Sequence, residues 1–89
     1  MGLEYKIETY DAARTNLPQL LRDRPDFLRE EAGTFHLGPL PETILLSVKE
    51  EEGYVYVSQH VASTETDALL GLILRRILSL NDHVVVSEI

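Results

Sequence analysis

Three histidines, His36, His60 and His83, have the widest chemical range of the side chains in this sequence. Imidazole nitrogens bind zinc and transfer protons near neutral pH, but a zinc site needs three or four ligands that converge. The three histidines fall on three separate predicted strands, and the chain has no cysteine to complete a ligand set. We therefore predict neither a metal site nor a cofactor.

Nucleophilic catalysis needs a hydroxyl group within hydrogen-bond distance of a base. Ser58 and His60 share one face of a predicted strand, but side chains spaced i, i+2 lie about 7 Å apart, which is too far. Asp82 and His83 are adjacent in the sequence, so on a strand they point to opposite faces. The five glycines form neither a dinucleotide-binding pattern nor a P-loop. The sequence therefore predicts no enzymatic activity.

The charge of the chain is strongly acidic. Its 89 residues include 8 Lys and Arg against 15 Asp and Glu, which gives a formal net charge of −7. Acidic side chains are concentrated between residues 42 and 67, where Lys49 is the one basic side chain. Such a field repels phosphate groups, so we predict no nucleic-acid binding and expect it to favour a basic protein partner.

The apolar content predicts a folded chain. Leu, Ile, Val and Phe make up about a third of the sequence, which is too many for a disordered segment. The length fits one domain, residues 1–89. No apolar run reaches the roughly 18 residues of a membrane span, so we predict no membrane insertion. With no cysteine for a disulfide framework, we expect a cytoplasmic protein.

The first third of the chain gives one clear strand and an ambiguous helical region. Leu3, Tyr5 and Ile7 alternate with charged residues, which predicts a half-buried strand over residues 3–8. Whether residues 11–31 form one helix or two is left open. A second helix start at Asn16, followed three residues later by Gln19, resembles a capping box, and Pro25 can open another helix that Gly33 ends. Residues 34–37 are predicted as a short strand, and residues 38–41 as a stiff loop.

The remaining residues predict a hairpin, a long helix and a final strand. The hairpin has apolar residues on one face and turns at residues 49–53, which are polar and end in a glycine. The helix is predicted from Thr64 to about residue 80, and the last strand at residues 84–86. This order predicts an α+β fold on the ferredoxin-like split βαββαβ plan with an extra short strand. We expect an antiparallel sheet with the helices packed on one face, although the helices could be placed as in small chaperone-like α+β domains.

Two surfaces could contact a partner. The second face of the hairpin carries tyrosines, which often anchor interfaces. The long helix has one leucine outside its apolar arc. In the alternative interpretation, the hairpin face is merely solvated and the whole helix belongs to the core. We predict five candidate interface residues: Leu45, Tyr54, Tyr56, His60 and Leu72.

These observations favour a small, acidic, non-enzymatic protein-interaction domain of the adaptor or chaperone-like kind. We expect it to self-associate as a homodimer, because a core of 89 residues gives little net stability and a partner adds burial. The alternative is a regulatory domain that senses a small molecule by binding a metabolite at a dimer interface. The sequence identifies neither the partner, nor the ligand, nor the pathway.

Overall fold

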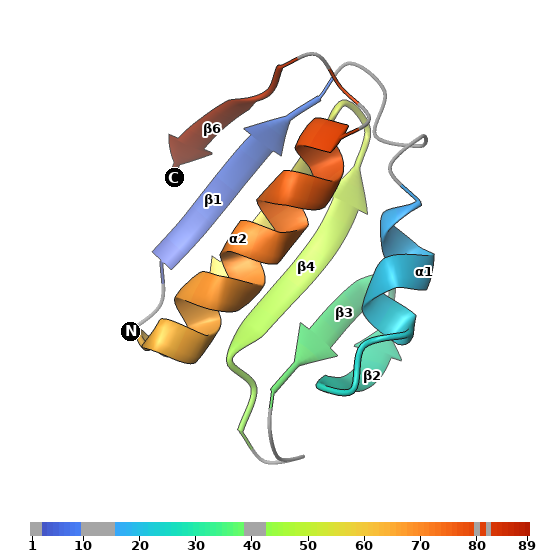
Figure 1. The fold of residues 1–89 in the computed structure, drawn as a ribbon, viewed down its shortest axis with the longest axis vertical. Coiled ribbons are helices and arrows are strands. Elements are labelled where there is room, and N and C mark those ends of the chain that lie inside the picture. Colours follow the sequence, from blue (N-terminus) through green and yellow to red (C-terminus); the bar gives the residue numbers. More distant parts are fainter. Residues whose placement is uncertain (1–2, 10–15, 39–42, 80, 82) are drawn as a thin grey trace.

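The computed structural model describes residues 3–9, 16–38, 43–79, 81 and 83–89. Within them, six strands form one antiparallel sheet in the order β2-β3-β4-β5-β1-β6. Both helices lie on the same face of this sheet, with α2 between α1 on one side and β1 with β6 on the other (Figure 1). The elements are β1 (Leu3–Glu8), α1 (Leu17–Arg22), β2 (Phe27–Glu31), β3 (Thr34–Leu37), β4 (Leu46–Glu51), β5 (Tyr54–Gln59), α2 (Thr64–Ser79) and β6 (Val85–Glu88).

The α+β class and the antiparallel sheet are confirmed, but the order of elements does not match the ferredoxin-like split plan. The difference comes from residues 27–31, which we predicted as part of a helix and which form β2 instead. Gly33 does not end a helix. It is the second residue of a two-residue hairpin turn, with φ of 51° at Ala32 and 82° at Gly33. Such a turn needs positive φ at both positions, and it pairs Glu31 directly with Thr34.

The helical region before β2 is shorter than predicted. Among the described residues before β2, only Leu17–Arg22 are helical, and residues 10–15 lie outside the described residues. The capping-box prediction was wrong, because Asn16 adopts a left-handed conformation and its side chain caps nothing. Residues 39–42 of the predicted stiff loop also lie outside the described residues.

Helix α2 begins at the predicted residue, but its cap lies one position earlier. The Ser63 hydroxyl accepts a hydrogen bond from the Thr66 N–H at 3.1 Å, which satisfies one of the first free donors of the helix. Glu65 and Asp67 in the first turn complement the positive end of the helix dipole. Neither described helix has the length and apolar character needed to cross a membrane.

The core lies between the helices and one face of the sheet. Alternation along β5 directs Val55, Val57 and Gln59 toward the helices, where all three are buried. Helix α2 contributes residues spaced three and four apart, and α1 contributes two leucines one turn apart. The buried apolar residues are Ile7, Leu17, Leu21, Phe35, Leu37, Leu45, Leu46, Val48, Val55, Val57, Leu69, Ile73 and Ile77. The opposite face of the sheet, which no described helix covers, is called the open face below.

Candidate interaction surfaces

The five predicted interface residues lie on two different sides of the sheet. Tyr54 and Tyr56 are half-buried on the open face, and His60 is exposed there. Leu45 and Leu72 instead line one hollow of about 230 Å³ beside α2. Leu45 does not share the face of the tyrosines, because alternation fails before β4 begins and Leu45 and Leu46 are both buried.

The tyrosines of the open face are engaged in polar contacts within the chain. The Lys6 ammonium lies 4.9 Å from the centre of the Tyr54 ring and 3.3 Å from a Glu8 carboxylate oxygen. The Tyr56 hydroxyl donates a hydrogen bond to Glu4, and this bond raises the pKa of Tyr56 above its ordinary value. These contacts are typical of a solvated sheet face whose polar and aromatic side chains contact one another within and across strands.

The open face also brings together two histidines and a serine. The Ser47 hydroxyl oxygen lies 2.7 Å from His36 Nδ1 and 2.8 Å from His60 Nε2. A hydroxyl donates only one hydrogen bond, so at least one of the two rings donates its N–H to the Ser47 oxygen. Sequence reasoning tested Ser58 as the partner of His60 and missed Ser47, because only the register of β3 with β4 places His36 opposite Ser47.

This cluster ties strands together more readily than it performs chemistry. Ser47 is only 5% exposed, so its hydroxyl is poorly accessible to a substrate. Burial lowers the pKa of His36, and Arg29 on the neighbouring strand lowers it further. His83 lies elsewhere, beside β6. Among the described residues, no three His, Asp or Glu side chains are grouped so that they could hold a metal ion.

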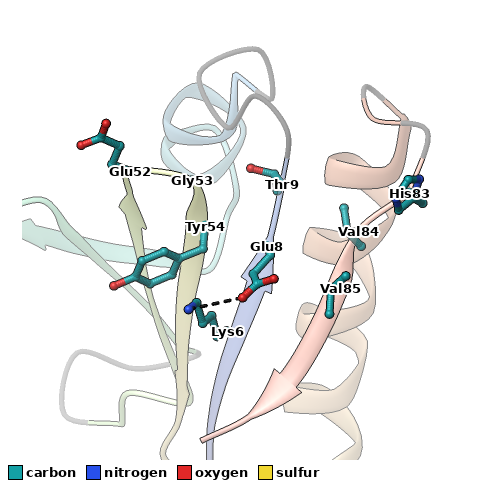
Figure 2. Close-up of a pocket in the computed structure, with 9 residues that line it drawn as sticks. All are labelled: Lys6, Glu8, Thr9, Glu52, Gly53, Tyr54, His83, Val84 and Val85. Atoms are coloured by element: carbon teal, nitrogen blue, oxygen red, sulfur yellow. Dashed lines mark ion pairs between the residues drawn. The ribbon is translucent and has the colours of Figure 1, made fainter.

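A hollow of about 500 Å³ lies at the end of β1, β5 and β6. Figure 2 shows the residues that line it, with Lys6 and Glu8 on β1, Tyr54 on β5, and Val84 and Val85 on the β6 segment. The Thr9 hydroxyl oxygen, also in its lining, is buried with no hydrogen-bond partner among the described residues. This combination of both charges, an aromatic ring and apolar side chains suits a small polar organic molecule.

A third hollow lies on the side of α2 that faces α1. It has a volume of about 280 Å³, and Leu20 of α1 forms one wall while Leu72 and Ile73 of α2 form another. Leu72, which is 45% exposed, therefore separates two shallow hollows along the seam between the helices. Arg24 and Arg75 border the hollow of about 280 Å³, whereas Asp26 and Glu65 border the hollow of about 230 Å³, so the seam carries both charges.

The two outer strands of the sheet differ sharply. On β2 the residues Arg29, Glu30 and Glu31 are charged and exposed, and a β-bulge interrupts the pairing between Phe27 and Arg29. Arg29 forms an ion pair with Glu31, and Glu30 forms one with Arg22 of α1 at 3.0 Å. Charges and bulges are the devices by which proteins keep an edge strand from pairing with another chain.

Strand β6 has few of these devices. Its register with β1 is regular, and every residue from Val85 to Glu88 is exposed. Val85 is 51% exposed, Val86 47% and the following Ile89 67%. The sequence predicted this strand but not its position at the edge of the sheet, because that position depends on pairing between distant residues.

The chain matches no protein-family model, no curated protein and no solved structure.

Proposed function

We propose that this chain is a non-enzymatic protein-interaction domain, of the adaptor or chaperone-like kind, that self-associates into a homodimer. The observation that carries the proposal is the contrast between the two edges of the sheet. Strand β2 is bulged and charged, whereas β6 exposes two valines and has no described strand on its outer side. An exposed apolar edge strand is a ready template for a further strand, and proteins that stay monomeric guard against it.

The charge of the chain limits the strength of this association. Two copies that each carry −7 repel one another, and this repulsion is screened by salt. We therefore expect dimerisation to strengthen as the ionic strength rises. The same acidity would speed the encounter of either copy with a basic protein partner.

The test compares three variants, one for each surface, by native mass spectrometry and light scattering over a concentration series. Val85→Lys places a charge on the β6 edge, where Glu8 on β1 is its opposite neighbour, so the monomer keeps its fold. We expect this variant to weaken dimerisation on the order of 100-fold, in the range of an interface hot spot.

The other two variants are the matched controls. Tyr54→Ser with Tyr56→Ser changes the open face, and Leu72→Glu changes the seam between the helices. Both should keep the dimer, with circular dichroism confirming the fold of each variant. A wild-type chain that stays monomeric at every concentration would overturn the proposal. If only one of the control variants loses the dimer, the interface lies on the surface which that control changes and not on β6.

A second candidate function, the sensing of a small molecule, is favoured by the hollow of about 500 Å³ beside β6. Its volume lies in the usual range of ligand sites, and the β6 segment forms part of its lining, next to the proposed interface. A ligand that binds there should raise the melting temperature in proportion to its affinity and concentration. Tyr54→Ala should abolish that rise, and a broad metabolite screen without any stabiliser would count against this function.

A further inference from the structure

We infer that the dimer forms by antiparallel pairing of β6 with β6 of a second copy, with Ser87 at the two-fold axis. This inference rests on the proposed self-association and adds the strand, its direction and its register. The two six-stranded sheets would then become one continuous sheet. The pairing is self-complementary, so it closes after two copies.

The hydrogen bonds between β6 and β1 show which backbone groups remain for a partner. The Ile89 N–H donates to the Glu4 carbonyl at 2.8 Å, so these two residues form a hydrogen-bonded pair. In an antiparallel ladder such pairs alternate with non-hydrogen-bonded ones. Val85 and Ser87 therefore bond to β1, whereas the N–H and C=O groups of Val86 and Glu88 point away from it.

Those outward groups allow three symmetric registers near the middle of the strand. Centring the pair on Glu88 places two carboxylates directly opposite each other, which is unfavourable. Centring it on Val86 uses the outward groups of Val84, which lies before β6. Centring it on Ser87 pairs Val86 with Glu88 of the second copy twice, so that all four hydrogen bonds form within β6.

The side chains also favour the Ser87 register. It places the Val85 of each copy opposite the Ile89 of the other, and these are the two most exposed large apolar residues in the described part of the chain. The small Ser87 side chains meet at the axis, where the strands approach most closely. Glu88 lies opposite Val86, at the edge of the apolar contact, and keeps access to solvent.

The size of the contact predicts a weak dimer. A standard interface buries about 800 Å² on each partner, and two paired strands of four residues cover less than this. We expect a dissociation constant in the micromolar range rather than the nanomolar range.

The absence of cysteine from the sequence makes disulfide trapping a clean test. In the Ser87 register the two Ser87 Cα atoms form a non-hydrogen-bonded pair, about 4.5 Å apart, which a disulfide can bridge. Ser87→Cys should form a covalent dimer under mild oxidation at least tenfold faster than Ser79→Cys, an exposed helix position that reports random collision. Val85→Cys mixed with Ile89→Cys should give the crossed dimer.

A proline provides the matched blocking variant. Val86→Pro removes an N–H that points away from β1, so it leaves the β1 pairing intact while it blocks an incoming strand. Native mass spectrometry should find Val86→Pro monomeric at concentrations where the wild-type chain is dimeric, and circular dichroism should show both folded.

Each other outcome has a definite meaning. Fastest trapping at Val86→Cys would overturn the Ser87 register. A wild-type dimer in which no β6 cysteine crosslinks faster than Ser79→Cys would overturn the β6 interface but leave self-association standing. A wild-type chain that is monomeric throughout would overturn both this inference and the proposed function.

Discussion

Strand β2 and strand β6 lie at opposite edges of one sheet, but the two strands differ in the features that prevent pairing with another chain. Strand β2 carries a β-bulge and paired charges, and β6 has a regular register and exposed valines. On β2, Arg29 is paired with Glu31, and Glu30 is held by Arg22 of the helix that lies over this end of the sheet (Figure 1). On β6, Val85, Val86 and Ser87 are uncharged, and Glu88 is the one charged residue. If β2 is protected and only β6 accepts another strand, a second copy can add at one edge of the sheet alone. Assembly would then stop at a dimer.

The largest expected effect comes from removing the protection of β2. Arg29→Val with Glu31→Val leaves an apolar strand at each edge, so copies could add at both ends and the sheet could propagate. We expect open-ended assembly, measured as a continuous rise of light scattering with concentration in place of a plateau at the dimer.

The chain contains a matched control for this experiment. Lys49 and Glu51 on β4 form an ion pair with the same i, i+2 spacing, at 3.2 Å, on a strand whose two sides are both paired. Lys49→Val with Glu51→Val adds the same apolar character without an edge and should keep the wild-type mass. If both double variants scatter alike, general hydrophobicity rather than edge protection controls assembly.

A smaller effect is expected at the loop that follows β3. A Cβ atom added to Gly38 would lie 2.0 Å from the Thr43 carbonyl oxygen, a backbone atom that cannot yield easily. The Gly38 N–H also donates to the Asp26 carbonyl at 2.8 Å, just before β2. Gly38→Ala should therefore destabilise the fold by about 1–3 kcal/mol in urea unfolding.

Gly71 provides the opposite case. It lies exposed within α2, with no atom within 4 Å of an added Cβ. Gly71→Ala should stabilise the chain by about 0.5–1 kcal/mol, because alanine loses less conformational entropy in a helix. If Gly38→Ala is instead as stable as the wild type, the backbone at Gly38 and Thr43 can shift to accommodate the added Cβ atom. Dimerisation through β6 should be unchanged in both variants.

Local patterns predicted the elements in which a single periodicity decides the structure. Alternation placed β1 and the β4–β5 hairpin, and helical spacing placed α2. β2 was missed because Gly33 fits the end of a helix as well as a hairpin turn. The positive φ of Ala32 decides between a helix end and a hairpin turn, but it cannot be predicted from the sequence, because alanine rarely adopts positive φ.

Features that depend on strand order could not be predicted. The contact of Ser47 with two histidines needs the registers of three strands, and each of these residues looks ordinary along its own strand. Val85 and Val86 were predicted in a strand, but whether a partner covers both sides of that strand depends on which distant residues it pairs with. The predicted interface therefore included Tyr54, Tyr56 and Leu72 and omitted β6.

The smallest predicted effect is a change of stability with pH, which we expect at the β2 edge and not at the β6 edge. His36 lies opposite Arg29 of β2, and it also faces Glu31 and His60. Burial, followed by Arg29, lowers its pKa below the ordinary value of 6.5, so the unfolded chain takes up the proton first as the pH falls. The contribution of His36 to stability is therefore complete above the unfolded pKa and is lost as the pH falls toward the folded one.

We expect the melting temperature of the wild-type chain to fall between about pH 7.5 and about pH 5.5, and His36→Gln to reduce that slope. Amide-exchange protection should decrease in β2 and β3 over this range, because protonated His36 is repelled by Arg29 beside it. Protection in β6 should be retained, since this cluster lies at the other end of the sheet. An unchanged slope in His36→Gln would show that acid acts elsewhere. Equal loss of protection at both edges would show that the sheet opens as one unit.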